Sequence, residues 1–192
     1  MLEEVRREIK SHLLLGLGIF VLVEAIWLFR GSFSTLKALL FFVGVIGGSF
    51  LLDSDHFLYW FFLYPQKKES LQAKTLWQQK NWRKLLALLG EKHRSHLSLV
   101  FHHFYFQAVL NLLALFVVTS TNSFLGQGIV LGAAGHLLKD EWEDFRTNPK
   151  HLQQWLLART PFSSLPLPSS WLRVYLLFYS IIFGGLLYAA SF

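Results

Sequence analysis

Acidic and histidine residues of this chain gather in short groups between long apolar runs. The first group is Leu51-Leu52-Asp53-Ser54-Asp55-His56, which separates the apolar residues 38–50 from the apolar residues 57–64. Ionisable side chains in such surroundings cost on the order of several kcal/mol unless they face water, a protein interior or a metal ion. Asp53 and Asp55 therefore indicate a functional site, with an ordinary helix end that meets water as the alternative.

Two later groups carry the same types of residue. His93-Arg94-Ser95-His96 stands directly before a third apolar run, and His136 and Asp140 stand at the end of a fourth. On a helix, His136 and Asp140 are four residues apart and share one face. If the helix of the third run begins early, His96 and His103 also share a face, because they are seven residues apart.

The composition is that of a membrane protein. Of the 192 residues, 53% are hydrophobic and only 16% are charged, whereas soluble domains carry about 25% charged residues. The chain has no cysteine, which excludes disulfides, thiolate catalysis and cysteine-bound zinc. The net charge of +6 is compatible with nucleic-acid binding, but the placement of the basic residues fits membrane topology better.

The apolar runs predict an all-α, polytopic membrane bundle that forms one integral membrane domain over residues 1–192. The first run is long enough, with its flanks, to cross about 30 Å of hydrocarbon. Gly44 and Gly48 in the second run have the small-xxx-small spacing that allows close helix packing. The five predicted spans are residues 13–29, 35–52, 97–118, 124–139 and 171–191.

The lysines and arginines set the orientation, because they favour the cytoplasmic side of a membrane. With the amino terminus inside, the cytoplasmic segments 1–12, 64–96 and 139–173 hold 16 of the 18 basic residues. We therefore expect a multi-pass protein of the inner membrane, with its amino terminus cytoplasmic and its carboxyl terminus outside. All three polar groups then reach the same cytoplasmic boundary.

Carboxylates and imidazoles that meet in this way suit a divalent metal. Oxygen and nitrogen ligands are typical of zinc, manganese and iron sites, and two ions could be accommodated. A metal would also stabilise carboxylates in poorly hydrated surroundings. Other interpretations stay open for single residues: His102 and His103 could form hydrogen bonds between helices, and His12 by itself carries a weak signal.

The connection 64–96 predicts a segment at the membrane surface. Basic residues alternate there with Trp77, Trp82 and several leucines, at roughly helical spacing over residues 74–89. A basic amphipathic helix of this kind lies on an anionic leaflet, so the expected partner is membrane lipid, either an anionic phospholipid or a lipid-linked substrate. A nucleic-acid patch is the alternative, which the apolar face disfavours. A second short surface helix is expected at 151–158.

The three polar groups resemble a known family, the LexA-binding, inner-membrane metal-dependent hydrolases. That family has a Leu-Pro-Asp-x-Asp-His motif, then His-Arg followed by Thr-His-Ser, then His-x-x-x-Asp in a glycine-rich helix. The resemblance covers about residues 50–140. Leu52 stands where the family has proline, and the gap between His93 and His96 is two residues shorter than in the family pattern.

The resemblance implies a metal-dependent hydrolase, and our hypothesis is that it acts on a phosphoester or lipid headgroup at the cytoplasmic boundary. The expected cofactor is zinc or manganese, which would activate a bound water. Arg94 would bind the substrate phosphate, and Asp140 or Glu141 would act as general base. A non-catalytic metal-binding membrane protein and an ion or small-molecule transporter are the alternatives. The expected metal ligands are Asp53, Asp55, His93, His96, His103, His136 and Asp140.

Overall fold

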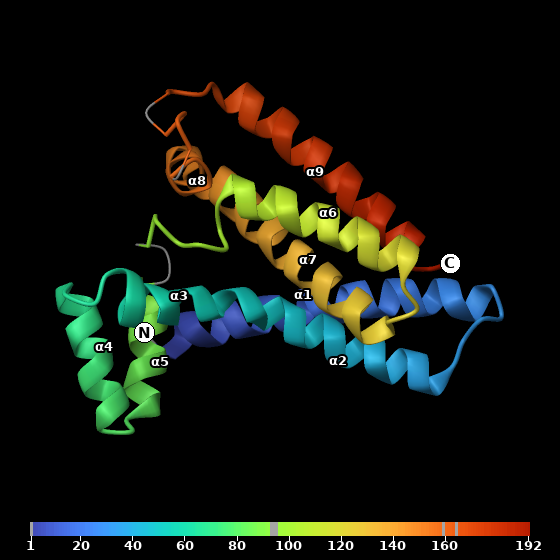
Figure 1. The fold of residues 1–192 in the computed structure, drawn as a ribbon, viewed down its shortest axis with the longest axis horizontal. Coiled ribbons are helices and arrows are strands. Elements are labelled where there is room, and N and C mark those ends of the chain that lie inside the picture. Colours follow the sequence, from blue (N-terminus) through green and yellow to red (C-terminus); the bar gives the residue numbers. More distant parts are fainter. Residues whose placement is uncertain (1, 93–95, 159, 164) are drawn as a thin grey trace.

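The computed structural model describes residues 2–92, 96–158, 160–163 and 165–192, and within these ranges it contains helices and no strands (Figure 1). This confirms the all-α prediction. The elements are α1 Leu2–Phe29, α2 Thr35–Leu51, η1 Leu52–Ser54, α3 Asp55–Leu58, η2 Tyr59–Leu63, α4 Lys68–Gln78, α5 Trp82–Lys92, α6 Phe104–Ser120, α7 Phe124–Thr147, α8 Pro149–Leu156 and α9 Ser169–Ala189.

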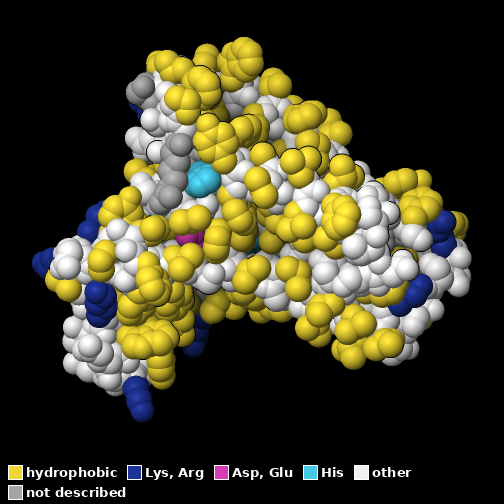
Figure 2. Space-filling model, in the orientation of Figure 1, with side chains coloured by type: hydrophobic (Ala, Val, Ile, Leu, Met, Phe, Trp, Pro, Cys, Tyr) yellow, Lys and Arg dark blue, Asp and Glu magenta, His cyan; other side chains and the backbone are white. Residues whose placement is uncertain are grey.

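Three helical segments of the described chain are long and apolar enough to cross a membrane, whereas the sequence predicted five. They are Val5–Phe29, Thr35–Leu63 and Ser169–Ala189. The predicted span 97–118 contains the shorter apolar helix α6, which has 17 residues. The predicted span 124–139 forms the first part of α7, whose second part is charged. Figure 2 shows a largely hydrophobic face with lysine and arginine side chains gathered towards its two ends, as a membrane protein requires.

The second span is longer than predicted. We expected its helix to end near Leu52, but the helical path continues through the 3₁₀ turn η1, the helix α3 and the π-helical segment η2 to Leu63. Neither glycine nor proline occurs between Ser49 and Tyr64, and Pro65 is the first residue that cannot continue a helix. The polar group 53–56 therefore lies inside a helical segment, at a change of winding of the kind often found at functional sites.

Glycines bring α2 and α7 into backbone contact, as the spacing of Gly44 and Gly48 predicted. A Cβ atom on Gly48 would lie 2.1 Å from the carbonyl oxygen of Ile129, and one on Gly132 would lie 2.2 Å from that of Val45. Such approaches are possible only for glycine. The contact fixes the polar end of α2 beside the second half of α7.

Helix α7 is the centre of the bundle. It packs against α2 and α1 on one side and against α6 and α9 on the other (Figure 1). Its residues Val130, Leu131, Ala133, Ala134 and Leu137 belong to the main hydrophobic core. Because four helices surround α7, polar side chains on it are withdrawn from lipid.

Residues 68–92 form a hairpin of two helices, α4 and α5, rather than the single helix expected over 74–89 (Figure 1). The chain turns at Lys80, which has a positive φ of 53°. The hairpin packs around the buried Trp60 of η2 through Ala73 and Leu85. The short helix expected at 151–158 is present as α8, and it packs against the start of α9.

Candidate metal centre

His136 on α7 is the centre of the candidate site. Its side chain is completely buried, and its Nδ1 lies 2.6 Å from the backbone carbonyl oxygen of Ser49. A carbonyl can only accept, so Nδ1 carries a proton, and Nε2 is the nitrogen that could bind a metal. That Nε2 lies 3.1 Å from Oδ2 of Asp140 and 3.9 Å from Oδ1 of Asp53. The ring is therefore held in the tautomer that binds a metal through Nε2.

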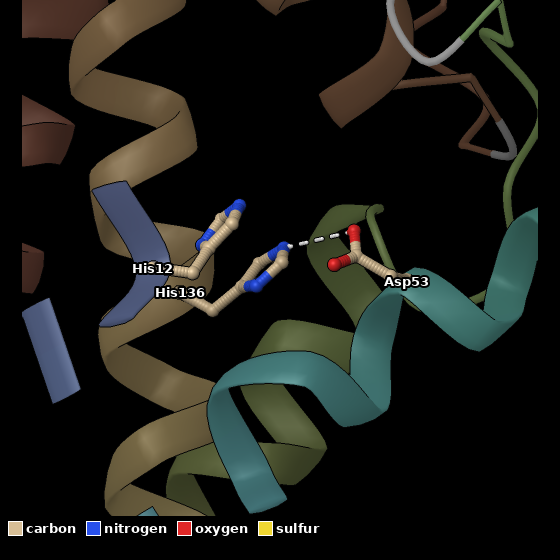
Figure 3. A group of neighbouring side chains, drawn as sticks. All are labelled: His12, Asp53 and His136. Atoms are coloured by element: carbon tan, nitrogen blue, oxygen red, sulfur yellow. Dashed lines mark ion pairs between the residues drawn. The ribbon is translucent and has the colours of Figure 1, made fainter. Parts of the chain in front are cut away.

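His12 and Asp53 approach His136 from two other helices (Figure 3). The His12 ring, on α1, stacks on the His136 ring with centroids 4.2 Å apart. Asp53, in η1, points its carboxylate at the edge of the His136 ring. One possible ligand atom from each of the three residues lies within 4.8 Å of the other two. These residues could hold a metal ion.

A second group shares His136 and adds His102 and Asp140, with ligand atoms again within 4.8 Å of one another. His102 lies just before α6, and its Nδ1 is 3.2 Å from Oδ2 of Asp55. Its Nε2 is 3.9 Å from Oδ2 of Asp140. A carboxylate behind a ligating imidazole fixes the ring and raises its basicity. Asp55 thus orients a candidate ligand.

Asp55 also organises the loop that carries His102. Its two carboxylate oxygens accept hydrogen bonds from the backbone N–H groups of Val100 and Phe101, at 3.0 Å and 2.5 Å. The Asp55 side chain is fully buried. With its oxygens occupied in this way, Asp55 holds the loop against the end of α2.

The loop before α6 corrects one expectation. Residues 96–103 are not helical, so His96 and His103 do not share a helix face. His103 is the N-cap of α6, and its side chain accepts a hydrogen bond from the N–H of Phe106 at 3.3 Å. The early helix start on which this alignment depended is not met, because Asp55 accepts the N–H groups of Val100 and Phe101 in the loop.

The distances within the second group suit a small divalent ion. Tetrahedral zinc with bonds of about 2.0–2.1 Å places neighbouring ligand atoms about 3.3 Å apart. The separations of 3.1 Å and 3.9 Å measured from Asp140 Oδ2 to His136 and His102 lie on either side of that value. In the described part of the chain, Nε2 of His102 is buried without a hydrogen-bond partner, and Nε2 of His136 faces Oδ2 of Asp140. Buried polar atoms of this kind call for a ligand or a water.

His96 belongs to a neighbouring polar cluster and to neither group. Its Nδ1 lies 2.7 Å from Nδ1 of His56, and its ring stacks on Tyr59 with centroids 3.9 Å apart. Glu69 of α4 lies 3.5 Å from its Nε2. This cluster joins the hairpin to the bundle. The predicted ligand His93 and the predicted phosphate-binding residue Arg94 lie outside the described residues.

Glu141 faces a different side of α7 from Asp140. Its buried carboxylate accepts hydrogen bonds from Nε2 of Gln107 at 2.7 Å and from the hydroxyl of Tyr175 at 2.8 Å. Glu141 lies beyond the predicted fourth span, and burial raises the pKa of its carboxyl to about 8. The structure therefore places this predicted base with α6 and α9.

A small cleft leads to the second group. It has a volume of about 40 Å³, enough for a bound water, and His102 and Asp140 line it. His151 of α8 stands at the same cleft, and its Nδ1 lies 2.6 Å from Oδ2 of Asp144. The Nε1–H of Trp155 also donates to Asp144, at 2.7 Å. The His151 imidazole, which Asp144 holds in place, therefore lies at the same cleft as the candidate ligands His102 and Asp140.

Sequence reasoning did not select His12 as a ligand, and it left open which of His93, His96, His102 and His103 bind the metal. The predicted topology had already placed residues 1–12 at the same membrane boundary as the other polar groups, so that signal could have selected His12. His102 carried no comparable signal, because its orientation depends on a loop held by Asp55.

No model of a known protein family matches this chain. No curated protein and no solved structure is significantly similar to it. The resemblance of the three polar groups to metal-dependent hydrolases therefore stays a prediction, and the function is inferred from the geometry of the residues themselves.

Proposed function

We propose that this chain is a membrane-embedded, metal-dependent hydrolase that acts on a phosphoester in a lipid headgroup. One observation carries the proposal. Two buried imidazoles, His102 and His136, have their Nδ1 atoms held by oxygen acceptors and turn their Nε2 atoms towards Asp140. This is the arrangement of a metal site with three protein ligands, which leaves a position for water or substrate.

His102, His136 and Asp140 would hold the ion, with zinc or manganese as the proposed metals. Bound there, the ion would lower the pKa of a water and polarise the phosphoryl group. Asp55 and the Ser49 carbonyl keep both rings in the ligating tautomer. Lys139, whose Nζ lies 3.0 Å from Oδ1 of Asp140, turns the other carboxylate oxygen towards the histidines.

His151 is placed to transfer a proton. It lines the cleft beside the proposed ligands, and Asp144 fixes its ring through Nδ1. A histidine with a carboxylate behind it can take a proton from water or give one to a leaving group near neutral pH. Glu141 is less suited to this role, because its carboxylate already accepts hydrogen bonds from Gln107 and Tyr175.

The α4–α5 hairpin supports a lipid substrate. Trp77 and Trp82 are 46% and 48% exposed, and their rings meet edge to face at 4.9 Å. The basic residues Lys80, Arg83 and Lys84 are exposed in the same turn and helix. Tryptophan and cations together favour the headgroup region of an anionic leaflet. We propose that the hairpin rests there, on the cytoplasmic side of the inner membrane, with α6 and the first part of α7 completing five spans.

Metal analysis of the purified protein tests the proposal first. Wild-type protein should retain about one zinc or manganese ion per chain, and His136→Ala should lose it. The His136→Ala variant should also lose hydrolysis of bis-p-nitrophenyl phosphate and of phosphatidylglycerol in vesicles. His103→Asn is the matched control, because His103 caps α6 and Asn also caps helices.

Two results would separate the alternatives. A folded wild-type protein that retains no divalent metal would overturn the hydrolase proposal. Bound metal without hydrolysis of either substrate would favour a non-catalytic metal-binding protein.

A further inference from the structure

A large apolar groove runs between α6 and α9. Its volume is about 640 Å³. Large apolar side chains of both helices form its walls, and the small residues Ala108 and Gly185 leave the space open. Since α9 is a candidate span and α6 an apolar helix, the groove faces the hydrocarbon layer. The wall residues are Leu112, Leu115, Phe178, Ile182 and Leu186.

One end of the groove is polar. Helices α6 and α9 run in the same direction (Figure 1), and the Tyr175 hydroxyl contacts the side chain of Gln107 near their starts. Asn111 and Tyr179 follow one turn further along each helix, and they also line the groove. Beyond them the lining is apolar. Polar side chains thus lie at one end of the groove, although nearly all of its exposed lining is apolar.

Two polar atoms at this end are buried without a hydrogen-bond partner in the described ranges. They are Oε2 of Glu141 and Oδ1 of Asn111. The Glu141 side chain is completely buried and hydrogen-bonds to Gln107 and Tyr175, both of which line the groove. Atoms of this kind favour a ligand with a polar group at this end.

We propose that the groove binds one hydrocarbon chain of a membrane lipid, with the polar part of that lipid at the Gln107–Glu141 end. Glu141, which accepts hydrogen bonds from Gln107 and Tyr175 at this end, faces a different side of α7 from Asp140. The groove therefore binds lipid whether or not Asp140 holds a metal ion. The further step, that the bound lipid is the substrate of the metal centre, rests on the proposed function.

The dimensions fit one acyl chain. At 1.5 Å per residue, the groove-lining segment from Tyr175 to Ala189 is about 21 Å long. Half of a hydrocarbon core of about 30 Å is about 15 Å. The groove thus accommodates the chain of a lipid from one leaflet.

Two adjacent glycines of α9 give a matched pair of variants. A Cβ atom would meet no atom within 4 Å at either Gly184 or Gly185. Of the two, Gly185 lines the groove. Gly185→Leu should fill the groove, and Gly184→Leu should place the same side chain outside it. Both changes replace glycine by a better helix former, so their intrinsic effects on the helix match.

The probe is a phosphatidylglycerol with a diazirine at the end of one acyl chain, in phosphatidylcholine vesicles. After irradiation, the labelled peptides are mapped by mass spectrometry. We expect labelling to concentrate on the groove walls of α6 and α9, to fall about tenfold in Gly185→Leu and to be unchanged in Gly184→Leu. Labelling spread evenly over the exposed faces of α1, α2 and α9, or equal labelling in the two variants, would overturn the inference. Cross-links between the groove walls and a second copy of the chain, in place of lipid labelling there, would also overturn the inference.

The same measurement on His136→Ala separates this inference from the proposed function. That variant should lose metal and hydrolysis yet keep the groove labelling. Groove labelling in a wild-type protein without metal would end the hydrolase proposal and leave the lipid site standing. Metal-dependent hydrolysis without groove labelling would overturn the lipid site and leave the hydrolase proposal standing.

Discussion

The Nδ1 atom of His136 on α7 lies 2.6 Å from the backbone carbonyl oxygen of Ser49 on α2. This contact links the packing of two helices to the state of a proposed metal ligand. The carbonyl requires a proton on Nδ1, so Nε2 is left to bind a metal. Ser49 follows Gly48, where the backbones of α2 and α7 touch, so the helix contact that builds the core also selects the tautomer.

Two variants identify which overlapping group holds the ion. His102 and His136 both have an oxygen acceptor at Nδ1, whereas neither nitrogen of His12 has a hydrogen-bond partner in the described residues. We therefore expect His102→Ala to abolish metal binding and His12→Ala to retain about one ion per chain. Metal content after gel filtration measures both.

If His12→Ala loses the ion and His102→Ala retains it, the ion is held by the group formed by His12, Asp53 and His136. Loss of metal in both variants, with normal folding, would show that His12 also supplies a ligand.

Asp55→Asn tests whether a carboxylate behind His102 controls metal affinity. Asparagine keeps the shape of the buried side chain, but it removes the charge that favours the ligating form of the imidazole and one of the two oxygens that accept from Val100, Phe101 and His102. Loss of an orienting carboxylate of this kind typically weakens metal binding by about 10–100-fold. Competition with a chromophoric chelator gives the Kd, and an affinity within twofold of wild type would contradict the role assigned to Asp55.

Much of the site could be predicted because it depends on helix geometry. His136 and Asp140 share a face of α7 at a spacing of four residues. The glycine spacing in α2 allowed a close helix approach, and the structure shows that α7 is the partner. In both cases the two residues are four positions apart, close to one helical turn, so the sequence alone shows that they share a helix face.

The rest depends on contacts that no local pattern encodes. Val100 and Phe101 give their N–H groups to Asp55, 45 and 46 residues earlier in the chain, and this contact sets where α6 begins. His12 of α1 stacks on His136 of α7, a contact that depends on how these two helices pack. Glu141 is the neighbour of Asp140, but a step of one residue turns a helix by about 100°, so it joins another cluster.

His103 should stabilise α6 rather than bind metal. Its side chain accepts the N–H of Phe106, which has no acceptor within the helix. His103→Ala should lower the free energy of unfolding by about 1 kcal/mol, the usual cost of a lost N-cap, and His103→Asn should restore it. Thermal unfolding in detergent measures the stability, and metal content should equal wild type in both variants. Loss of metal from His103→Asn would return His103 to the ligand set.

The contact between α2 and α7 is tested most directly by adding one methyl group. In Gly48→Ala the Cβ atom would lie 2.1 Å from the carbonyl oxygen of Ile129, and backbone cannot move aside as a flexible side chain can. We expect a loss of at least about 3 kcal/mol, at or above the upper end of the usual cost of overpacking, together with reduced metal content because Ser49 moves with Gly48.

Gly47→Ala is the matched control. Gly47 is exposed, and a Cβ atom there meets no atom within 4 Å. Alanine favours the helix over glycine by about 1 kcal/mol, so this variant should be as stable as wild type or more stable. If Gly48→Ala unfolds at the same temperature as Gly47→Ala and binds as much metal, then α2 and α7 do not meet at Gly48, and the link between helix packing and the His136 tautomer is lost.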